Sequence, residues 1–168
     1  MKKMLRIVTT DLQKYNIQHF VIGGAVLGYA RNKRLIPYDN DLDIMIDGEF
    51  WNTTLFSKIQ EKWKSVDGFS IKLKDQGDKL WVLYSSTNGN LIDLWPWYVM
   101  GDLVRYYKWA KPEWDIPMKF IFPLKSINIS GVHTYGPGDP VGYCEWQYGE
   151  NWRTEKTCKE IKENKCVV

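Results

Sequence analysis

The six residues from Asp41 to Ile46 constrain the fold most, because polar and apolar side chains alternate along them. Successive side chains of a β-strand point to opposite faces of its sheet, so this alternation predicts a strand. The apolar positions, which we expect in the core, are Leu42, Ile44 and Ile46. On the other face Asp41 and Asp43 are neighbours, followed by Met45. Two adjacent carboxylates repel each other unless a cation lies between them, so the pair predicts a divalent metal ion.

The rest of the chain has the composition of an ordinary folded domain. Its 168 residues are 44% hydrophobic and 26% charged, which favours a single domain over residues 1–168. No apolar run approaches the ~20 residues that a membrane-spanning helix needs, and polar residues interrupt the N-terminal segment before a signal-peptide core forms. We therefore expect a soluble, cytoplasmic chain without a membrane span.

Charge is distributed unevenly along the chain. The net charge of +3 is too small to predict a nucleic-acid partner. Residues 1–35 hold seven basic residues and one acidic residue, whereas residues 36–50 hold five acidic residues and no basic one. A metal ion needs anions and a phosphate needs cations, so a carboxylate cluster bordered by cations is what a metal–phosphate site requires.

Hydrophobic periodicity and turn residues predict an α+β fold, in which helices flank a small mixed sheet. Helices are expected over residues 3–16, 25–31, 50–64, 139–148 and 153–164. Strands are expected over residues 19–22, 41–46, 69–74, 79–85 and 90–95, and a hairpin over residues 125–130 and 132–135. The three cysteines lack zinc-like spacing, so reduced thiols are favoured over a structural zinc site; they are Cys144, Cys158 and Cys166.

Two further features lie where a phosphate and a metal ion could bind. Gly23 and Gly24 end a short strand and precede a helix, which leaves room for a phosphate against backbone N–H groups, although a plain tight turn is the alternative. Asp93 lies within an apolar strand, where a carboxylate is costly unless it is paired or bound to metal. The alternative for Asp93 is an edge-strand position that faces water.

A Gly-Gly pair, an Asp-x-Asp strand and a third acid on a later strand have the layout of the nucleotidyltransferase fold. Residues 22–44 read IGGAVLGYARNKRLIPYDNDLDI. This stretch resembles the LicD family, which contains bacterial phosphocholine transferases and fukutin-type ribitol-phosphate transferases. The family pattern runs Gly-Gly-Thr-Leu-Leu-Gly-x-x-Arg, a short basic loop, and Ile-Pro-Trp-Asp-Asp-Asp-Ile-Asp. Residues 92–96 are similar to the family's third-acid strand and residues 137–152 to its closing element, so the resemblance covers roughly residues 4–152.

The chain departs from the family pattern at four positions. Ala25 stands in place of Thr, which removes a hydroxyl contact to phosphate at that point. Asn32 stands where a His is common, which leaves the role of that position open. Tyr38 and Asn40 replace a Trp and the middle Asp of the motif, but both strand carboxylates are intact.

The resemblance implies an enzyme that transfers a phospho-alcohol group, of the phosphocholine or ribitol phosphate type, from a CDP-activated donor. The acceptor is a hydroxyl of a glycan or glycolipid, and CMP is released. Two Mg²⁺ (or Mn²⁺) ions bridge the diphosphate in such a reaction. We expect Asp41 and Asp43 to bind both ions, and Asp93 to hold the second ion and accept the proton of the acceptor.

The resemblance also assigns roles to residues that would bind the substrate. We expect Arg31, together with Lys33 or Arg34, to pair with diphosphate oxygens; a solvated basic loop is the alternative for these residues. Gly23 and Gly24 would let the backbone approach the phosphate. Three tryptophans could stack on cytosine or enclose choline, but core packing is favoured for each of them: Trp95, Trp97 and Trp109.

Three other functions share parts of this pattern. A nucleotidyltransferase that leaves the nucleotide on the acceptor has the same acids, but it releases pyrophosphate rather than CMP. A non-catalytic nucleotide-binding module is disfavoured because all three acids are present. A metal-dependent glycosyltransferase also uses Asp-x-Asp, but nothing in the 168 residues resembles a long sugar-nucleotide domain.

Overall fold

The computed structural model describes residues 1–51, 53–74, 80–85, 89–106 and 112–154, with the backbone alone over 72–74 and 80–85. Its helices are α1 (Lys2–Lys14), α2 (Gly23–Asn32), α3 (Thr54–Lys64), α4 (Met118–Ile121) and α5 (Pro140–Tyr148), with the 3-10 helices η1 (Pro112–Trp114) and η2 (Glu150–Arg153). Its strands are β1 (His19–Val21), β2 (Asp41–Asp47), β3 (Phe69–Lys74), β4 (Leu80–Ser85), β5 (Leu91–Met100), β6 (Leu103–Tyr106), β7 (Ile116–Pro117), β8 (Lys125–Ile129) and β9 (Val132–Gly136).

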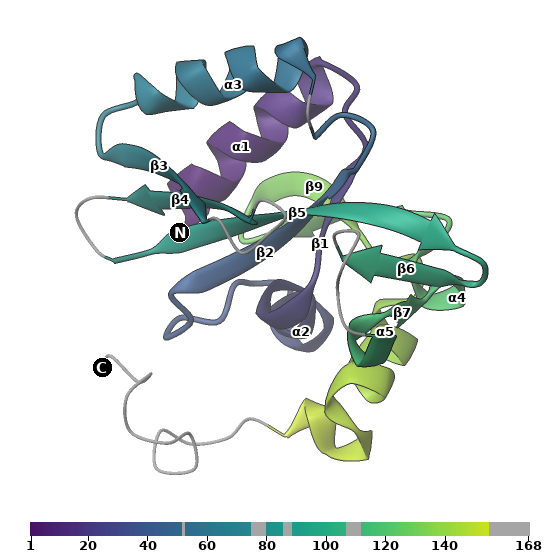
Figure 1. The fold of residues 1–168 in the computed structure, drawn as a ribbon. Coiled ribbons are helices and arrows are strands. Elements are labelled where there is room, and N and C mark those ends of the chain that lie inside the picture. The colour runs from purple at the N-terminus through teal and green to yellow at the C-terminus, as the bar shows by residue number, and fades with distance from the viewer. Residues whose placement is uncertain (52, 75–79, 86–88, 107–111, 155–168) are drawn as a thin grey trace.

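Within the described residues, seven strands form one mixed sheet, and β8 and β9 form a separate hairpin (Figure 1). The central order of the sheet is β1-β2-β5-β4-β3, and β6 pairs with the second half of β5 and with β7. Strands β2 and β5 run parallel, whereas every other pair in these two sheets is antiparallel. The predicted α+β fold with a small mixed sheet flanked by helices is confirmed.

The helices divide between the two faces of the main sheet. Helices α1 and α3 lie over one face, and α2 and α5 lie on the other side (Figure 1). The alternation along β2 fits this division, because Leu42, Ile44 and Ile46 are buried while Asp43 faces the start of α2. Met45 is also fully buried, so both faces of β2 enter the core toward its end.

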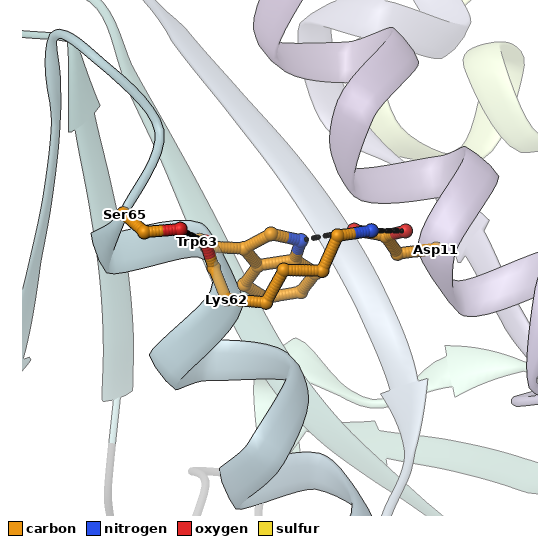
Figure 2. Close-up of polar contacts among 4 residues, drawn as sticks. All are labelled: Asp11, Lys62, Trp63 and Ser65. Atoms are coloured by element: carbon orange, nitrogen blue, oxygen red, sulfur yellow. Dashed lines mark hydrogen bonds and ion pairs between the residues drawn. The ribbon is translucent and has the colours of Figure 1, made fainter.

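A buried carboxylate joins the two helices that cover the first face. Asp11 of α1 accepts a hydrogen bond from the indole Nε1 of Trp63 in α3, at 2.9 Å, and forms an ion pair with Lys62 (Figure 2). Ser65, one residue past the end of α3, donates its hydroxyl to the carbonyl of Lys62 at 2.7 Å. A buried charge is tolerated when it is paired and hydrogen-bonded, so this cluster fixes how α1 and α3 pack.

Two boundaries differ from the sequence-based prediction for local reasons. Helix α3 begins at Thr54 rather than at residue 50, because the Thr53 side chain accepts the backbone N–H of Phe56 and caps the helix. Strand β5 continues past residue 95 through Pro96. On the side of β5 away from β2, β4 pairs as far as Leu94 and β6 begins to pair at Trp97. Pro96 lies between these two pairings, so its missing N–H interrupts neither of them.

The C-terminal half is organised by a hairpin and a capped helix. The predicted hairpin is present as β8 and β9, and the predicted helix at 139–148 is α5, whose N-cap Asp139 accepts the N–H of Gly142 at 2.9 Å. The helix predicted at 153–164 lies mostly outside the described residues, and η2 covers 150–153 instead. Strands β6 and β7 and helix α4 are short elements that hydrophobic periodicity did not reveal.

Candidate active site

The three acids singled out in the sequence lie on two adjacent parallel strands. Asp41 and Asp43 are on β2, Asp93 is on β5, and Asp43 and Asp93 are register partners across the pair. Asp41 is exposed, whereas Asp43 and Asp93 are half-buried. Side chains directly opposite in a sheet share a face, so Asp43 and Asp93 project to the same side. Asp41, two residues before Asp43 on β2, lies on that face as well.

The surroundings of Asp43 make it costly to ionise. Trp95, two residues beyond Asp93 on β5, donates its indole N–H to Asp43 Oδ1 at 2.9 Å. Burial raises the pKa of Asp43 to about 6; the Trp95 hydrogen bond opposes this shift, and the charges of Asp93 and Asp41 reinforce it. Among the described residues, no basic side chain is one of the groups that shift the pKa of this carboxyl. A divalent cation would relieve the excess negative charge.

Asp39 is a fourth acid of this site, which the sequence analysis counted in the acidic cluster but did not assign. Burial, and then the hydrogen bond and charge of Asp41, raise the pKa of Asp39 to about 7. Its carboxylate lies against Gly24, where an added Cβ would collide with Asp39 Oδ2. The spacing of Asp39, Asp41 and Asp43 at i, i+2 and i+4 is the signal that could have identified it, although Asp39 lies in the loop just before β2 begins.

The Gly-Gly turn lies directly beside the acids. Gly23 has a φ of +61°, which favours glycine, and a Cβ added there would lie 3.0 Å from Asp43 Oδ2. Its backbone N–H donates to the hydroxyl of Tyr143 in α5 at 2.9 Å. Both glycines therefore allow the start of α2 to approach the carboxylates closely, and Tyr143, which the sequence analysis did not identify, holds this turn in place.

Aromatic residues surround the acids on the same side. Trp95 packs edge-on against Tyr106, with ring centroids 5.6 Å apart. Burial raises the pKa of Tyr106, Tyr143 and Tyr148 above the usual value for tyrosine, and the negative charge of Asp43 adds to each shift. These hydroxyls stay neutral near pH 7. Trp97 is buried in the core, as favoured from the sequence, and Trp109 lies outside the described residues.

The basic residues predicted to bind the diphosphate lie at and beyond the C-terminal end of α2. Arg31 donates to the carbonyls of Trp152 and Thr154, at 2.7 Å for Trp152 and 2.8 Å for Thr154. Lys33 adopts a left-handed conformation at the end of α2, with its ammonium 4.0 Å from the ring centroid of Tyr29. Arg34 is exposed and, with Arg31, lines a cavity of about 100 Å³. Their contact with a diphosphate stays a prediction.

The donor set of the site fits a hard divalent cation. The acids Asp39, Asp41, Asp43 and Asp93 offer carboxylate oxygens, which are the ligands that Mg²⁺ and Mn²⁺ prefer. Among the described residues, no three acidic, His or Cys side chains are gathered closely enough to ligate an ion as they stand. Like-charged carboxylates repel one another without a cation, so binding would require them to draw together. Cys144 is a buried free thiol, and the other two cysteines lie outside the described residues.

Comparison with known proteins relates this site to one family. The family described as LicD/FKTN/FKRP, nucleotidyltransferase domain, matches residues 16–139. Ribitol 5-phosphate transferase FKRP of Homo sapiens is 28% identical over 153 residues, covering 89% of this chain and 31% of that protein. The uncharacterized protein RT0683 of Rickettsia typhi is 29% identical over 140 residues, covering 83% of this chain and 42% of that protein. The chain thus spans about a third of the length of FKRP.

Solved structures are similar in fold. The lincomycin-bound lincosamide antibiotic adenylyltransferase LnuA has a TM-score of 0.54 at 15% identity, covering 82% of this chain and 80% of that one. ANT(2'')-Ia in complex with adenylyl-2''-tobramycin has a TM-score of 0.54 at 16% identity, covering 82% and 68%. At these identities the likeness shows the nucleotidyltransferase fold alone. No helix among the described residues is both long and apolar enough to span a membrane.

Proposed function

Because the chain belongs to the LicD/FKTN/FKRP family through its nucleotidyltransferase domain, we propose that it is a metal-dependent phospho-alcohol transferase. The donor is a CDP-activated alcohol, the acceptor is a hydroxyl of a glycan or glycolipid, and CMP is released. The similar protein FKRP is named a ribitol 5-phosphate transferase, which supports a phospho-alcohol rather than a bare nucleotide as the transferred group.

The observation that carries this proposal is the placement of acids against a glycine turn. Asp43 and Asp93 oppose each other on parallel strands, and Gly23 lies beside Asp43 with no side chain between them. A diphosphate bound at this turn would meet backbone N–H groups of the start of α2 and the carboxylates of β2 and β5. Anionic substrate and anionic protein are compatible only when cations lie between them.

Residues of this chain would hold those cations. In this proposal Asp41 and Asp43 would ligate Mg²⁺ or Mn²⁺, together with Asp93 of the adjacent strand β5 and with Asp39, which lies beside Asp41. Bound metal would supply charge neutralisation on the diphosphate as CMP departs. Arg31, Lys33 and Arg34 are the basic residues proposed to contact the donor, and of these Lys33 and Arg34 are exposed.

The transfer itself is a substitution at one phosphorus atom. The acceptor hydroxyl oxygen forms a bond to the phosphorus that carries the alcohol, and the bond from that phosphorus to the bridging oxygen of CDP breaks. CMP leaves with the electron pair, and the proton of the acceptor hydroxyl passes to Asp93. The product is a phosphodiester that joins the alcohol to the glycan. Asp93 is half-buried on β5 and lies opposite Asp43, so the proposed base is next to the proposed metal ligands.

A donor panel tests this proposal. The chain is incubated with CDP-choline, CDP-ribitol, CDP-glycerol and CDP-ethanolamine, each with a glycan acceptor and Mg²⁺ or Mn²⁺, and CMP is quantified by chromatography. We expect metal-dependent CMP release with one donor class. Release of pyrophosphate from a nucleoside triphosphate, with the nucleotide left on the acceptor, would instead identify a nucleotidyltransferase. Binding of donor without turnover under every condition would identify a binding module.

A further inference from the structure

The indole of Trp95 makes a specific contact with the acidic site. Trp95 lies on the same face of β5 as Asp93 and diagonally across from Asp43, and its Nε1 donates to Asp43 Oδ1 at 2.9 Å. The ring is half-buried and packs edge-on against Tyr106, at an interplanar angle of 61°. The position of the donor is therefore set by the strand register on one side and by Tyr106 on the other.

This hydrogen bond distinguishes the two oxygens of Asp43. Oδ1 accepts the indole N–H, whereas Oδ2 lies toward Gly23, 3.0 Å from the position that a Cβ would take there. The terminal torsion of an aspartate is broad, so an untethered carboxylate samples many orientations. With Oδ1 tethered, Oδ2 is held toward the Gly-Gly turn, where the proposed diphosphate would bind.

The chemical type of the donor is important for a metal ligand. A Lys or Arg at this position would pair with Asp43 and neutralise the charge that attracts a cation. An indole N–H is a donor only and carries no charge, so it orients the carboxylate and leaves its negative charge available. Residues that hydrogen-bond to metal-binding carboxylates orient these ligands, and their loss typically lowers metal affinity.

We propose that Trp95 is a positioning residue that orients the Asp43 carboxylate for divalent metal binding; this inference rests on the proposed function. The measurement is Mn²⁺ binding, followed as the loss of the free-ion signal in electron paramagnetic resonance, at pH 8 and without substrate. Trp95→Phe keeps an aromatic ring beside Tyr106 and removes the N–H. Its dissociation constant for Mn²⁺ is expected to rise about 10- to 100-fold.

The structure contains a matched control. Trp63 also donates its indole N–H to a carboxylate, that of Asp11, at 2.9 Å (Figure 2). Asp11 lies on α1 and Trp63 on α3, across the sheet from α2 (Figure 1). Trp63→Phe is expected to lower the melting temperature and to leave the Mn²⁺ dissociation constant unchanged. If losing an indole had only a structural effect, Trp63→Phe and Trp95→Phe would both be less stable, and the two variants would bind Mn²⁺ with the same affinity.

A second variant tests the N–H itself and does not depend on Trp95→Phe folding. In Trp95→His, the imidazole Nε2 is as many bonds from Cβ as the indole Nε1 is, so its N–H can take the same place. Trp95→His is expected to keep a Mn²⁺ dissociation constant close to that of the wild type. Equal affinity in the wild type and Trp95→Phe, or no recovery in Trp95→His, overturns the role of Trp95. Absence of Mn²⁺ binding in the wild type overturns the metal dependence of the proposed function, and the Trp95 inference with it.

Discussion

Two aspartates of this chain accept an indole N–H at the same distance, 2.9 Å, but they lie in opposite electrostatic settings. Asp11, between α1 and α3, is also paired with Lys62 and is almost fully buried. Asp43, between β2 and α2, is surrounded by other acids, and burial raises its pKa to about 6. Asp11 therefore has its counter-charge within the protein, whereas the described part of the chain brings no basic side chain against Asp43.

The difference teaches how to separate structural from functional carboxylates. A buried acid paired with a cation contributes to packing, and its removal leaves partner groups unsatisfied. An acid held among like charges costs stability in the metal-free protein, so its presence needs another reason. The same isosteric substitution at the two positions should therefore have opposite consequences.

The largest expected effect follows from neutralising the acidic strand. Asp41→Asn or Asp43→Asn should abolish Mn²⁺ binding and reduce turnover by about 100-fold or more, because each change removes a proposed carboxylate ligand of the metal ion. The melting temperature in EDTA should be retained or raised, since each change removes charge repulsion. Electron paramagnetic resonance of Mn²⁺, the CMP assay and scanning calorimetry measure these three outcomes. Wild-type activity in either variant would disprove the metal assignment.

Asp93 should affect the chemical step more than binding. Asp93→Asn is expected to retain substantial affinity for CDP in Mg²⁺ and to lose about 10²- to 10⁴-fold in rate, the range for a positioned general base. Titration calorimetry with CDP and single-turnover kinetics separate the two. Near-normal turnover would mean that Asp93 has no part in the reaction. Complete loss of nucleotide binding would mean that Asp93 acts only as a metal ligand.

These assignments show how much the sequence could predict. The alternation from Asp41 to Ile46 located β2 and its acidic face, because strand periodicity depends on the local sequence alone. The opposition of Asp43 and Asp93 depends on parallel pairing across about 50 residues, which periodicity does not encode. The hydrogen bond of Trp95 to Asp43 and that of Gly23 to Tyr143 are likewise long-range contacts. The sequence indicated three of the four acids and the glycine turn of the candidate site, whereas tertiary packing determined its geometry and brought in Tyr143.

Substitution at the structural carboxylate should affect stability and not chemistry. Asp11→Asn keeps the shape of the side chain and removes the charge that pairs with Lys62, so the free energy of unfolding is expected to fall by about 1–3 kcal/mol. Urea denaturation measures this change. Mn²⁺ affinity and CMP release should equal those of the wild type. A loss of metal affinity in Asp11→Asn would contradict the purely structural role assigned to Asp11.

The smallest expected effect is a pH dependence of stability in the metal-free protein. The pKa values of Asp39 and Asp43 are raised to about 7 and about 6, above the value near 3.8 expected in the unfolded chain. Between about pH 4 and pH 7 the folded state therefore binds more protons than the unfolded state, so these two groups lower the free energy of unfolding as the pH rises.

Urea midpoints in EDTA at pH 5 and pH 8 test this sign by comparing Asp43→Asn with the wild type. Groups whose pKa does not depend on Asp43, including the buried His19, contribute equally and cancel in the difference. Asp39 does not cancel, because the charge of Asp43 raises its pKa; removing that charge changes the stability difference in the same direction. The variant should gain stability relative to the wild type at pH 8 and lose that advantage at pH 5. A difference that is constant across this range would mean that Asp43 titrates as an ordinary surface acid.

The most direct test of the central claim is the identity of the products. Phosphorus NMR of the wild-type chain, incubated with the CDP-alcohol selected by the donor panel and a glycan acceptor, follows both phosphorus atoms of the donor. We predict that a CMP monoester signal and a new phosphodiester signal appear together in Mg²⁺ or Mn²⁺ and are both absent in EDTA and in Asp43→Asn. Formation of both products at the wild-type rate in EDTA, or a nucleotide found attached to the acceptor, would contradict the account.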